Sequence, residues 1–426
     1  MLNKMKSHLF VGKTILSYLV SLSFILGAVN LGAVRKAPYL IYREYEDEDD
    51  NEVQCREMQI LCQLEGEDDC KIQWRTGEEF YNNYVDMESS ETGHQYFYTI
   101  ENLTPGKLYY YKVTIGREEP KVYESSFRAN PATDATTAKF FVYGDTRLYP
   151  EVHDEVAADI IANYADNPTW QTCVISVGDL VNNGGNENNW DGEFFDPSYP
   201  NIQEMLATMP YQSCIGNHEF EDGDDGGGGT LFRKYFPYPY YQDPENPNPN
   251  DTHYWSFDYG PAHFTYVDQY ELYDETEDEY YCSGAQLRWI EQDLDETDKK
   301  WKFLVLHHPG WGWQNPPQPE GRRHHNNNTQ VQSDLQPLCI EHGVSFVFGG
   351  HNHFYARAEV GGVQHITTGG GGAELVDEPP IGDLNYPNIV ESASAHHYCR
   401  VEIIDDILTF EAVDTTGIVF DAVTLE

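Results

Sequence analysis

Basic residues are scarce in this chain. It has 26 Lys and Arg against 71 Asp and Glu among 426 residues, so its formal net charge is -45. A surface of this sign repels nucleic-acid phosphates and anionic lipids, which argues against binding to either through a basic face. Hydrophobic residues make up 40% and aromatic residues 14%, so the acidic excess does not indicate a disordered chain. The length predicts two or three domains with a substantial core.

Long apolar runs are missing beyond the amino terminus. After the first 33 residues, no segment approaches the ~20 continuous apolar residues that a membrane-spanning helix needs. Lys4, Lys6 and Lys13 precede an apolar stretch that ends at Gly32-Ala33. This pattern predicts a secretory signal peptide over residues 1–33, and an uncleaved membrane anchor is the alternative. We therefore expect a secreted or periplasmic (extracellular) protein with no membrane span after signal cleavage.

The eight cysteines include no Cys-x-x-Cys pair, which argues against a structural zinc–thiolate site. An even number in an exported chain favours some disulfide bonds. Cys55, Cys62 and Cys70 lie close together, so at least one local bridge is expected there. Cys173 and Cys214 sit in apolar runs, where a buried thiol is as plausible as a bridge. The connectivity stays open.

Residues 38–128 have the character of short β-strands. Apolar residues alternate from Met58 to Leu64, and turn and charge signals separate the runs, which predicts a small β-sandwich. The turn Leu103-Thr104-Pro105-Gly106 precedes Tyr109, which is the pattern of a tyrosine corner in a fibronectin type III-like sandwich. An ordinary hairpin with surface tyrosines is the alternative. The polar residues 129–137 predict a linker after this domain.

Residues 138–426 alternate between apolar runs and helical patterns. The runs that predict buried strands are residues 140–143, 174–177, 212–215, 303–306 and 345–348. Helical patterns begin at Pro150 and Ser283, and a third runs through Val331, Leu335 and Leu338. Alternating strands and helices indicate an α/β domain with an αββα layering, placed after the all-β sandwich.

Each of these five strands runs directly into residue types that bind metals. The strand ends are followed by Gly144-Asp145, Gly178-Asp179, Gly216-Asn217-His218-Glu219, His307-His308-Pro309 and Gly349-Gly350-His351-Asn352-His353. Sites in open α/β sheets form beyond the carboxyl ends of the strands, so these five tips should converge. Glycine at the tips lets the backbone turn sharply and approach a ligand closely.

Carboxylate, amide and imidazole donors suit Fe, Mn or Zn. One carboxylate can bridge two cations ~3.5–4 Å apart, and such a pair generates a hydroxide nucleophile and holds phosphate oxygens. The donor set therefore predicts two divalent or trivalent metal ions and phosphoester hydrolysis.

The ordered motifs GD, GD, GNHE, HHP and GHNH resemble those of the calcineurin-like metallophosphoesterases. With the sandwich in front of it, the chain resembles a purple acid phosphatase from about residue 38 to 426. The resemblance implies that residues 138–426 form a calcineurin-like metallophosphoesterase catalytic domain. It also implies which residues bind each metal. Asp145 and His353 would bind the first metal, Asn217, His307 and His351 the second, and Asp179 would bridge both.

The same resemblance assigns roles to neighbouring residues. His218 would face the substrate and act as the general acid for the leaving oxygen. Glu219 would orient the ligands around it. His308 is interpreted as a packing or ligand-orienting residue, because only one histidine of the pair takes the ligand position.

The chain also departs from the family pattern. Purple acid phosphatases have a Tyr ligand of the first metal where this chain has Asn182, and other relatives have a His ligand where it has Arg147. Asn182 would lend its amide oxygen, or water would fill that place. Arg147 would hold a phosphate oxygen, or would pair with a local acid such as Glu151 or Asp154. His324 and His325 lie in a loop that would contact the substrate, with a polar loop of no role as the alternative.

These observations predict a secreted, metal-dependent acid phosphatase that hydrolyses phosphate monoesters of small molecules. Its nucleophile would be a hydroxide activated by two metals, with His218 as the acid. The nearest alternative is a phosphodiesterase or nucleotide hydrolase on the same scaffold. A third possibility is a non-catalytic, acidic extracellular protein that binds cations.

Overall fold

The computed structural model describes residues 34–45, 54–77, 79–90, 93–117, 119–220, 229–242, 252–274, 279–312, 327–383 and 386–426. The predicted signal peptide, the side chain of Cys55, and His324 and His325 lie outside the described part of the chain. Among the described residues, no helix is long and apolar enough to cross a membrane.

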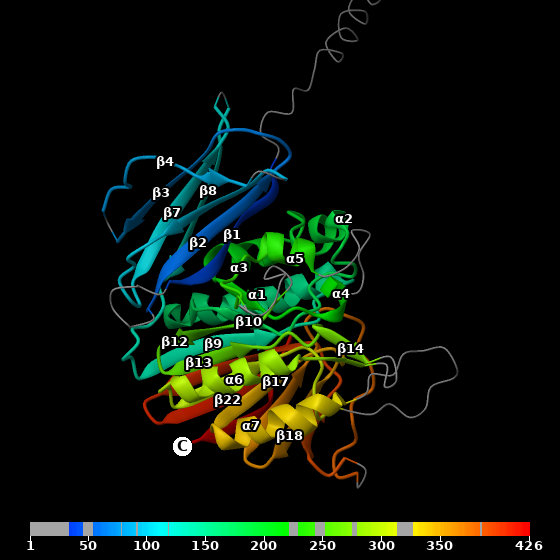
Figure 1. Cartoon of the computed structure of the whole chain (residues 1–426). Helices are drawn as coiled ribbons and strands as arrows, with labels where there is room; N and C mark the ends of the chain where they lie inside the picture. The colour runs from blue at the N-terminus through cyan, green and yellow to red at the C-terminus, as the bar shows by residue number, and fades with distance from the viewer. Residues whose placement is uncertain are drawn as a thin grey trace, which may run out of the picture.

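The amino-terminal part is a sandwich of two four-stranded sheets, drawn in blue and cyan at the upper left of Figure 1. One sheet has the order β1-β2-β6-β5 and the other β4-β3-β7-β8. The strands are β1 (Val34–Tyr45), β2 (Gln54–Leu64), β3 (Cys70–Thr76), β4 (Val85–Asp86), β5 (Glu88–Ser89), β6 (Gln95–Ile100), β7 (Leu108–Ile115) and β8 (Lys121–Arg128). This confirms the predicted sandwich.

Residues 58–64 of β2 are all buried, so this strand is covered on both faces and not only on the face that the alternating apolar residues predict. The Tyr109 hydroxyl accepts a hydrogen bond from the Thr104 backbone N–H at 2.9 Å, which is the contact expected of a tyrosine corner. The assignment to the fibronectin type III-like class stays a prediction.

The rest of the chain is built on two larger sheets. The first has the order β11-β10-β9-β21-β22-β23, and the second has the order β12-β13-β16-β17-β19-β18-β20. The strands of the first sheet are β9 (Thr137–Tyr143), β10 (Val174–Ser176), β11 (Tyr211–Ser213), β21 (His397–Ile404), β22 (Ile407–Asp414) and β23 (Val419–Leu425). Those of the second are β12 (Trp255–Tyr259), β13 (Ala262–Tyr266), β16 (Trp301–Val305), β17 (Val344–Gly349), β18 (Tyr355–Val360), β19 (Val363–Thr368) and β20 (Ile389–Ala393). A short pair, β14 (Leu272–Asp274) and β15 (Glu279–Tyr281), stands apart.

Aromatic side chains fill the space between the two large sheets. Phe140 of the first sheet meets Phe264 and Phe303 of the second edge to face, with ring centroids 5.0 and 5.3 Å apart. Phe346 stacks on Phe410 across the same interface at 5.4 Å. Edge-to-face and offset-stacked rings at these distances add to the stabilisation from their buried area.

Helices cover the outer faces of both sheets, which confirms the α/β layering. Helix α1 (Pro150–Asp166) contacts β21, and α3 (Pro200–Thr208) packs against β1 and β8, so both lie between the first sheet and the sandwich (Figure 1). Helices α6 (Gly284–Glu296) and α7 (Gln336–Glu341) contact β13 and β17 of the second sheet. The shorter segments are η1 (Pro168–Trp170), α2 (Glu187–Asn189), η2 (Trp190–Phe194), α4 (Asn217–Phe220), α5 (Thr230–Tyr235) and η4 (Val331–Leu335).

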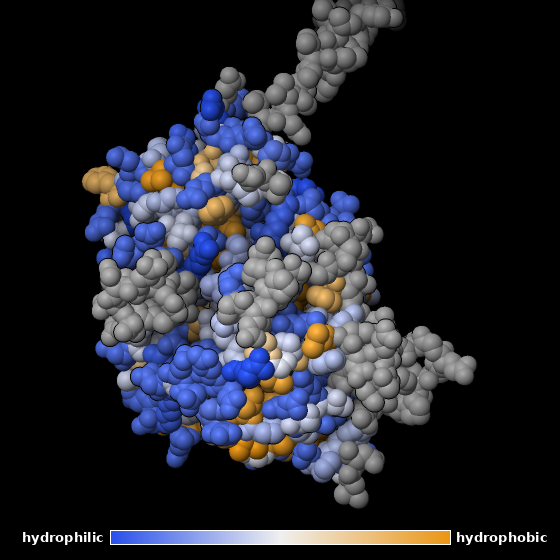
Figure 2. Space-filling view, in the orientation of Figure 1, coloured by the Kyte–Doolittle hydropathy of each residue, from blue (hydrophilic) through white to orange (hydrophobic). Residues whose placement is uncertain are grey.

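The predicted helix starts are confirmed. Helix α1 begins at Pro150, where a missing backbone N–H costs nothing. Ser283 caps α6 by accepting a hydrogen bond from the Gln286 N–H at 3.1 Å. The third helix differs from expectation, because the segment from Val331 to Leu335 is a π-helical turn that leads into α7. Most of the face shown in Figure 2 is hydrophilic, as the acidic composition predicts.

Candidate metal centre

Five parallel strand ends bring the predicted metal ligands together. Strands β9, β10 and β11 are parallel neighbours in the first sheet, and β16 and β17 are parallel neighbours in the second. The backbone turns sharply where three of the ligands stand: Asp145, Asp179 and His351 have φ values of 55°, 56° and 65°. Residues other than glycine rarely adopt this left-handed conformation, and such strain is concentrated at functional sites.

Glycines at these tips permit close contact with the carboxylates. A Cβ on Gly216 would stand 2.2 Å from Oδ1 of Asp179, and a Cβ on Gly350 would stand 2.3 Å from Oδ2 of Asp145. Any side chain at either position would therefore collide with a predicted ligand. The glycines of residues 369–372 also pass close to the site, since the Gly371 N–H donates to the Gly144 carbonyl at 2.9 Å.

Four side chains surround the predicted second metal position. The Asn217 Oδ1 atom lies 3.1 Å from His307 Nε2 and 3.0 Å from His351 Nδ1. His307 Nε2 also lies 3.3 Å from Asp179 Oδ1. The four donor atoms thus converge on one point, as the ligands of a single metal ion must.

Backbone carbonyls set the tautomers of three histidines. His307 Nδ1 donates to the Val177 carbonyl at 2.7 Å, His353 Nδ1 to the Glu374 carbonyl at 2.8 Å, and His218 Nδ1 to the Asn182 carbonyl at 2.7 Å. A neutral imidazole that donates through Nδ1 carries its lone pair on Nε2. The Nε2 atoms of His307 and His353 are therefore prepared as ligands.

Three donors surround the predicted first position. Asp145, Asp179 and His353 are buried, and their ligand atoms lie within 4.8 Å of one another. His353 Nε2 is 3.6 Å from Asp145 Oδ1. Arg147 reaches into the same place: its Nε lies 3.3 Å from Asp179 Oδ2, and a terminal nitrogen lies 3.3 Å from His353 Nε2.

Glu219 holds two of the tips together without facing the donor atoms. Its Oε2 accepts hydrogen bonds from the backbone N–H groups of Asp179 and Gly216, both at 3.0 Å. Its Oε1 accepts from Leu180 at 2.8 Å and from Val181 at 3.3 Å. A buried carboxylate with this many donors fixes the loops that carry Asp179 and Asn217.

The acids and histidines have strongly perturbed pKa values. Burial raises the pKa of Asp145 to about 8 and that of Glu219 to about 7. Burial also pushes the pKa of Asp179 upward, but the charges of His307 and His218 outweigh it and hold that pKa well below its usual range. Burial lowers the pKa of His307, yet Asp179 brings it to about 9. Opposed shifts within one cluster are typical of functional sites.

Two residues that support the site were not predicted. The Gln269 Oε1 atom accepts hydrogen bonds from the backbone N–H groups of His307 and His308, at 3.0 and 2.7 Å. The Glu193 carboxylate accepts from the Leu148 and Asn182 N–H groups, at 3.0 and 2.8 Å. A signal for Gln269 was present, because it follows the apolar run of β13 as another polar residue at a strand end. No local pattern marks Glu193.

The remaining predicted residues are placed as follows. His308 stacks on the ring of His351 with centroids 3.9 Å apart. Asn182 accepts from His218 and donates to Glu193 through its backbone. Arg147 contacts Asp179 and His353, and within the described part of the chain it forms no ion pair with Glu151 or Asp154. Asp154 instead accepts from the Asn201 and Ile202 N–H groups, at 2.8 and 3.1 Å.

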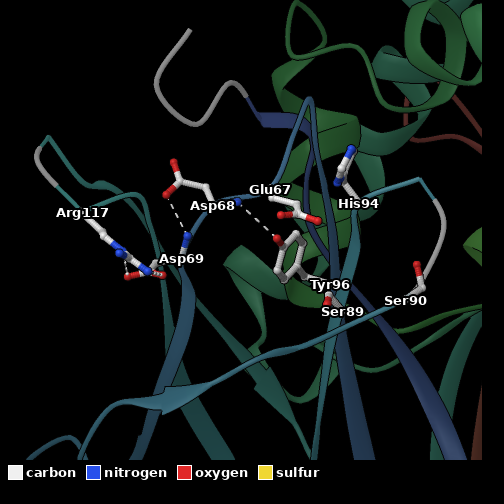
Figure 3. Close-up of a pocket in the computed structure, with 8 residues that line it drawn as sticks. All are labelled: Glu67, Asp68, Asp69, Ser89, Ser90, His94, Tyr96 and Arg117. Atoms are coloured by element: carbon white, nitrogen blue, oxygen red, sulfur yellow. Dashed lines mark hydrogen bonds and ion pairs between the residues drawn. The ribbon is translucent and has the colours of Figure 1, made fainter. Parts of the chain in front are cut away.

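A separate hollow of about 700 Å³ lies on the sandwich (Figure 3). Its lining includes Glu67, Asp68, Asp69, His94 and Arg117, and Arg117 pairs with Asp69 at 2.5 Å. None of the predicted site residues lines it. The predicted metal ligands therefore lie at the strand tips and not in this hollow.

The donor set fits metal ions at both positions, though unequally. The second position combines one carboxylate, one amide oxygen and two imidazoles with their donor atoms facing one another. These ligand types suit Fe, Mn or Zn. The first position has two carboxylates and one imidazole, together with the guanidinium of Arg147.

A family model described as calcineurin-like phosphoesterase matches residues 139–355. The match begins in β9 and ends in β18, so it includes all five strand tips. It confirms the family resemblance identified from the motifs.

Curated relatives are purple acid phosphatases and an acid phosphatase. The chain is 27% identical to purple acid phosphatase 18 of Arabidopsis thaliana over 186 residues, which cover 40% of this chain and 38% of that protein. It is 25% identical to acid phosphatase type 7 of Homo sapiens, over 61% of this chain and 56% of that protein. It is 26% identical to the probable inactive purple acid phosphatase 9 of Arabidopsis thaliana, over 61% and 42%. The chain thus spans about two fifths to just over half of the length of these relatives.

Solved structures agree on the fold over nearly the whole chain. The structure of purple acid phosphatase PPD1 from yellow lupin (Lupinus luteus) seeds superimposes with a TM-score of 0.65 at 18% identity, covering 91% of this chain and 74% of that one. The structure of PhoD superimposes with a TM-score of 0.62 at 14% identity, covering 93% and 91%. At these identities the likeness establishes the fold and leaves the substrate open.

Proposed function

Because the chain belongs to the calcineurin-like phosphoesterase family, we propose that it is a secreted, metal-dependent phosphatase that hydrolyses phosphate monoesters of small molecules. The observation that carries this proposal is the convergence of the two aspartates, one asparagine and three histidines at the strand tips. Their donor atoms face one another, and backbone carbonyls set the tautomers of His307 and His353. The relatives named acid phosphatases support the monoester class.

The metal ligands are proposed as the resemblance assigns them. Asp145 and His353 would hold the first ion, Asn217, His307 and His351 the second, and Asp179 would bridge both. Iron, zinc or manganese ions held by these residues would supply a water nucleophile of lowered pKa and positive charge for the phosphoryl oxygens. Asn182 contributes its backbone to the site, because it accepts from His218 and donates to Glu193.

His218 is proposed to protonate the departing alcohol. Its Nδ1 donates to the Asn182 carbonyl, and its Nε2 lies 3.8 Å from Asp179 Oδ2, on the open side of the site with 16% of its side chain exposed. One ring nitrogen is thus held by the backbone, and the other faces the cluster of predicted metal ligands, where a phosphate would bind. In its protonated form it donates a proton to the leaving oxygen, as a general acid does.

Arg147 is proposed to bind a phosphate oxygen as well. A guanidinium is a planar donor that pairs with phosphate as readily as with carboxylate. His324 and His325 remain proposed substrate contacts on the basis of the sequence alone.

Export and a disulfide bond are part of the same proposal. The sulfur atoms of Cys62 and Cys70 lie 3.6 Å apart in the interior of the sandwich, on strands of opposite sheets. In an oxidising compartment the two thiols would lose two protons and two electrons to an exported thiol–disulfide oxidoreductase, forming one S–S bond.

The intact mass of protein isolated from its host tests both signal cleavage and the disulfide bond. Cleavage near Ala33 and a mass lower by two hydrogen atoms than that of the reduced protein are expected, and an uncleaved, fully reduced chain would contradict them.

Comparison of p-nitrophenyl phosphate with bis(p-nitrophenyl) phosphate tests the function. The chain without its signal peptide is stripped with a chelator and reloaded with Fe, Mn or Zn, and Asp179→Asn is the control. We expect monoester hydrolysis that returns with metal and is lost in the control. Faster hydrolysis of the bis-ester would instead support a phosphodiesterase with the same residues in the same roles. Hydrolysis of neither ester would support a non-catalytic cation-binding protein, and one relative is named probable inactive.

A further inference from the structure

Arg147 contacts the metal-facing atoms of two of the three donors at the first position. Its Nε lies 3.3 Å from Asp179 Oδ2, and a terminal guanidinium nitrogen lies 3.3 Å from His353 Nε2. The side chain of Arg147 is only 11% exposed. The guanidinium therefore lies inside the cluster and not at its rim.

The contact with His353 uses the lone pair that a metal ion would need. His353 Nδ1 donates to the Glu374 carbonyl at 2.8 Å, so in the neutral ring, which is the form that binds a metal ion, Nε2 carries the lone pair. Arginine is a donor only. The guanidinium N–H and a metal ion are thus alternative partners for one imidazole lone pair.

Asp179 divides its two oxygens between the two positions. Its Oδ1 faces His307 Nε2 at 3.3 Å, on the side of the second position, while its Oδ2 faces Arg147. Arg147 therefore competes for the first position alone. The second position, formed with Asn217, His307 and His351, keeps its donors.

The neighbours of Arg147 restrict how far it can withdraw. The Thr146 N–H donates to the Asp179 carbonyl at 3.0 Å, and its hydroxyl donates to the Leu180 carbonyl at 3.0 Å. The Leu148 N–H donates to Glu193 at 3.0 Å, and Leu148 has a φ of 74°. With the backbone held on both sides, only rotation of the side chain itself can move the guanidinium. Because arginine does not lose its proton, its charge remains close to the first position.

We propose that the guanidinium of Arg147 occupies the first metal position in place of a metal ion, so that the two metal positions differ in metal affinity. The second position fills first and tightly. The first accepts a metal ion only when the guanidinium turns away, and the ion then also meets the repulsion of a nearby positive charge. This inference rests on the proposed metal centre and adds to it an order of filling.

Metal stoichiometry and visible absorption with Co²⁺ test the inference without any measurement of activity. The full-length mature chain is stripped and titrated with Co²⁺ by calorimetry, while the absorption of the bound ion is recorded. We expect one tight equivalent and a second that binds at least about tenfold more weakly, which is the range in which groups around a site change metal affinity. Arg147→Met, similar in length and uncharged, should raise the affinity of the second equivalent by at least about tenfold, whereas Arg147→Lys should not.

Substitution of two predicted metal-binding histidines shows which metal position binds the tight and which the weak equivalent of Co²⁺. His307→Ala should abolish the tight equivalent, while His353→Ala should leave it and abolish the weak one. Two equally tight equivalents in the unmodified chain, or no gain in Arg147→Met that retains the native circular dichroism spectrum, would overturn the inference and leave the proposed function standing. Binding of no metal ion by the unmodified chain would overturn both.

Discussion

His218 is the residue whose chemistry is easiest to separate from metal binding. Its imidazole is oriented by the Asn182 carbonyl, and it stands 3.8 Å from Asp179 Oδ2 without lying among the donor atoms of either position. As the proposed general acid, it would act on the substrate and not on the metal. Its loss should therefore affect turnover and leave metal content unchanged.

The substitution His218→Asn should lower kcat by about 10²–10⁴-fold, which is the usual contribution of a general acid. The bound metal, measured by elemental analysis of the same samples, should not change. The measurement uses an alkyl phosphate, because p-nitrophenolate leaves with little protonation and its ester should show a smaller loss. Full kcat of the variant on the alkyl phosphate would show that another group protonates the leaving oxygen.

Glu219 acts through the backbone of its neighbours. The substitution Glu219→Gln keeps the size of the side chain but turns an N–H₂ group toward backbone donors. We expect metal affinity to fall about 10–100-fold and the free energy of unfolding to fall by about 1–3 kcal/mol. Metal titration and urea unfolding measure these effects. Glu291→Gln, at an exposed position of α6, is the matched control and should change neither quantity.

At the scale of elements, one histidine joins the second sheet to the helix that covers it. His263 of β13 lies between Asp258, at 2.8 Å from Nδ1, and Asp293 of α6, at 3.0 Å from Nε2. Ser256 and Thr265 also donate to Asp293, and Lys299 approaches Asp258 at 3.5 Å. Burial lowers the pKa of His263, but the two carboxylates outweigh it and raise that pKa from 6.5 to about 10.

This raised pKa predicts a loss of stability at high pH. The contribution of the His263 cation is complete below pH 6.5, the value for the unfolded chain, and disappears as the pH rises through about 10. Each pKa unit corresponds to about 1.4 kcal/mol, so the loss amounts to a few kcal/mol. Burial lowers the pKa of Lys36 to about 8, so the contribution of Lys36 to stability rises with pH over the same range. The unmodified chain and a His263 variant share this contribution, so the comparison of the two isolates the effect of His263. The unfolding free energy of His263→Gln should decline less between these pH values than that of the unmodified chain, and parallel curves would contradict the assignment.

The strand ends show what local sequence predicts well. An apolar run followed by glycine and a carboxylate identified β9 and β10, and the same reasoning placed Asn217, His307 and His351 at one edge. The general rule that parallel strands end at a common site was enough to bring them together. It was not enough to place Arg147, because whether its side chain turns toward Glu151 or toward Asp179 depends on contacts remote in sequence.

Other features could not be predicted from local sequence patterns either, because they also depend on contacts remote in sequence. Glu193 lies in a π-helical turn and supports Leu148 and Asn182, which are 45 and 11 residues away. Cys62 and Cys70 are close in sequence, yet their approach depends on the packing of two opposite sheets. Long-range packing of this kind leaves no periodic signal in the sequence.

For the whole molecule, buried charges connect the sandwich to the part of the chain that carries the candidate site. Lys36 of β1 is fully buried and donates to Gln63 and to Asp191 of η2, both at 2.5 Å. Arg35 donates to the other oxygen of Asp191 at 2.7 Å. The same turn carries Glu193, which holds the loops of Arg147 and Asn182. The sandwich thus supports the turn that orders one side of the metal centre.

Loss of Asp191 should destabilise the protein, because it leaves the Lys36 ammonium buried with one polar partner fewer. We expect Asp191→Ala to lower the free energy of unfolding by about 3–5 kcal/mol in urea. The control is Asp406→Ala, which removes the exposed ion pair with Lys300 and should cost at most about 1 kcal/mol. Equal effects of the two substitutions would show that the buried pair does not stabilise the contact with the sandwich.

The convergence of the five strand ends predicts a metal centre there. Anomalous diffraction from crystals of the chain without residues 1–33, grown with Zn²⁺ or Mn²⁺, locates the bound ions. We expect a strong anomalous peak among Asp179, Asn217, His307 and His351, and a weaker one near Asp145 and His353 that strengthens in Arg147→Met. Crystals in which the metal is bound elsewhere, with no peak among these residues at millimolar metal, would show that the strand ends do not form a metal centre.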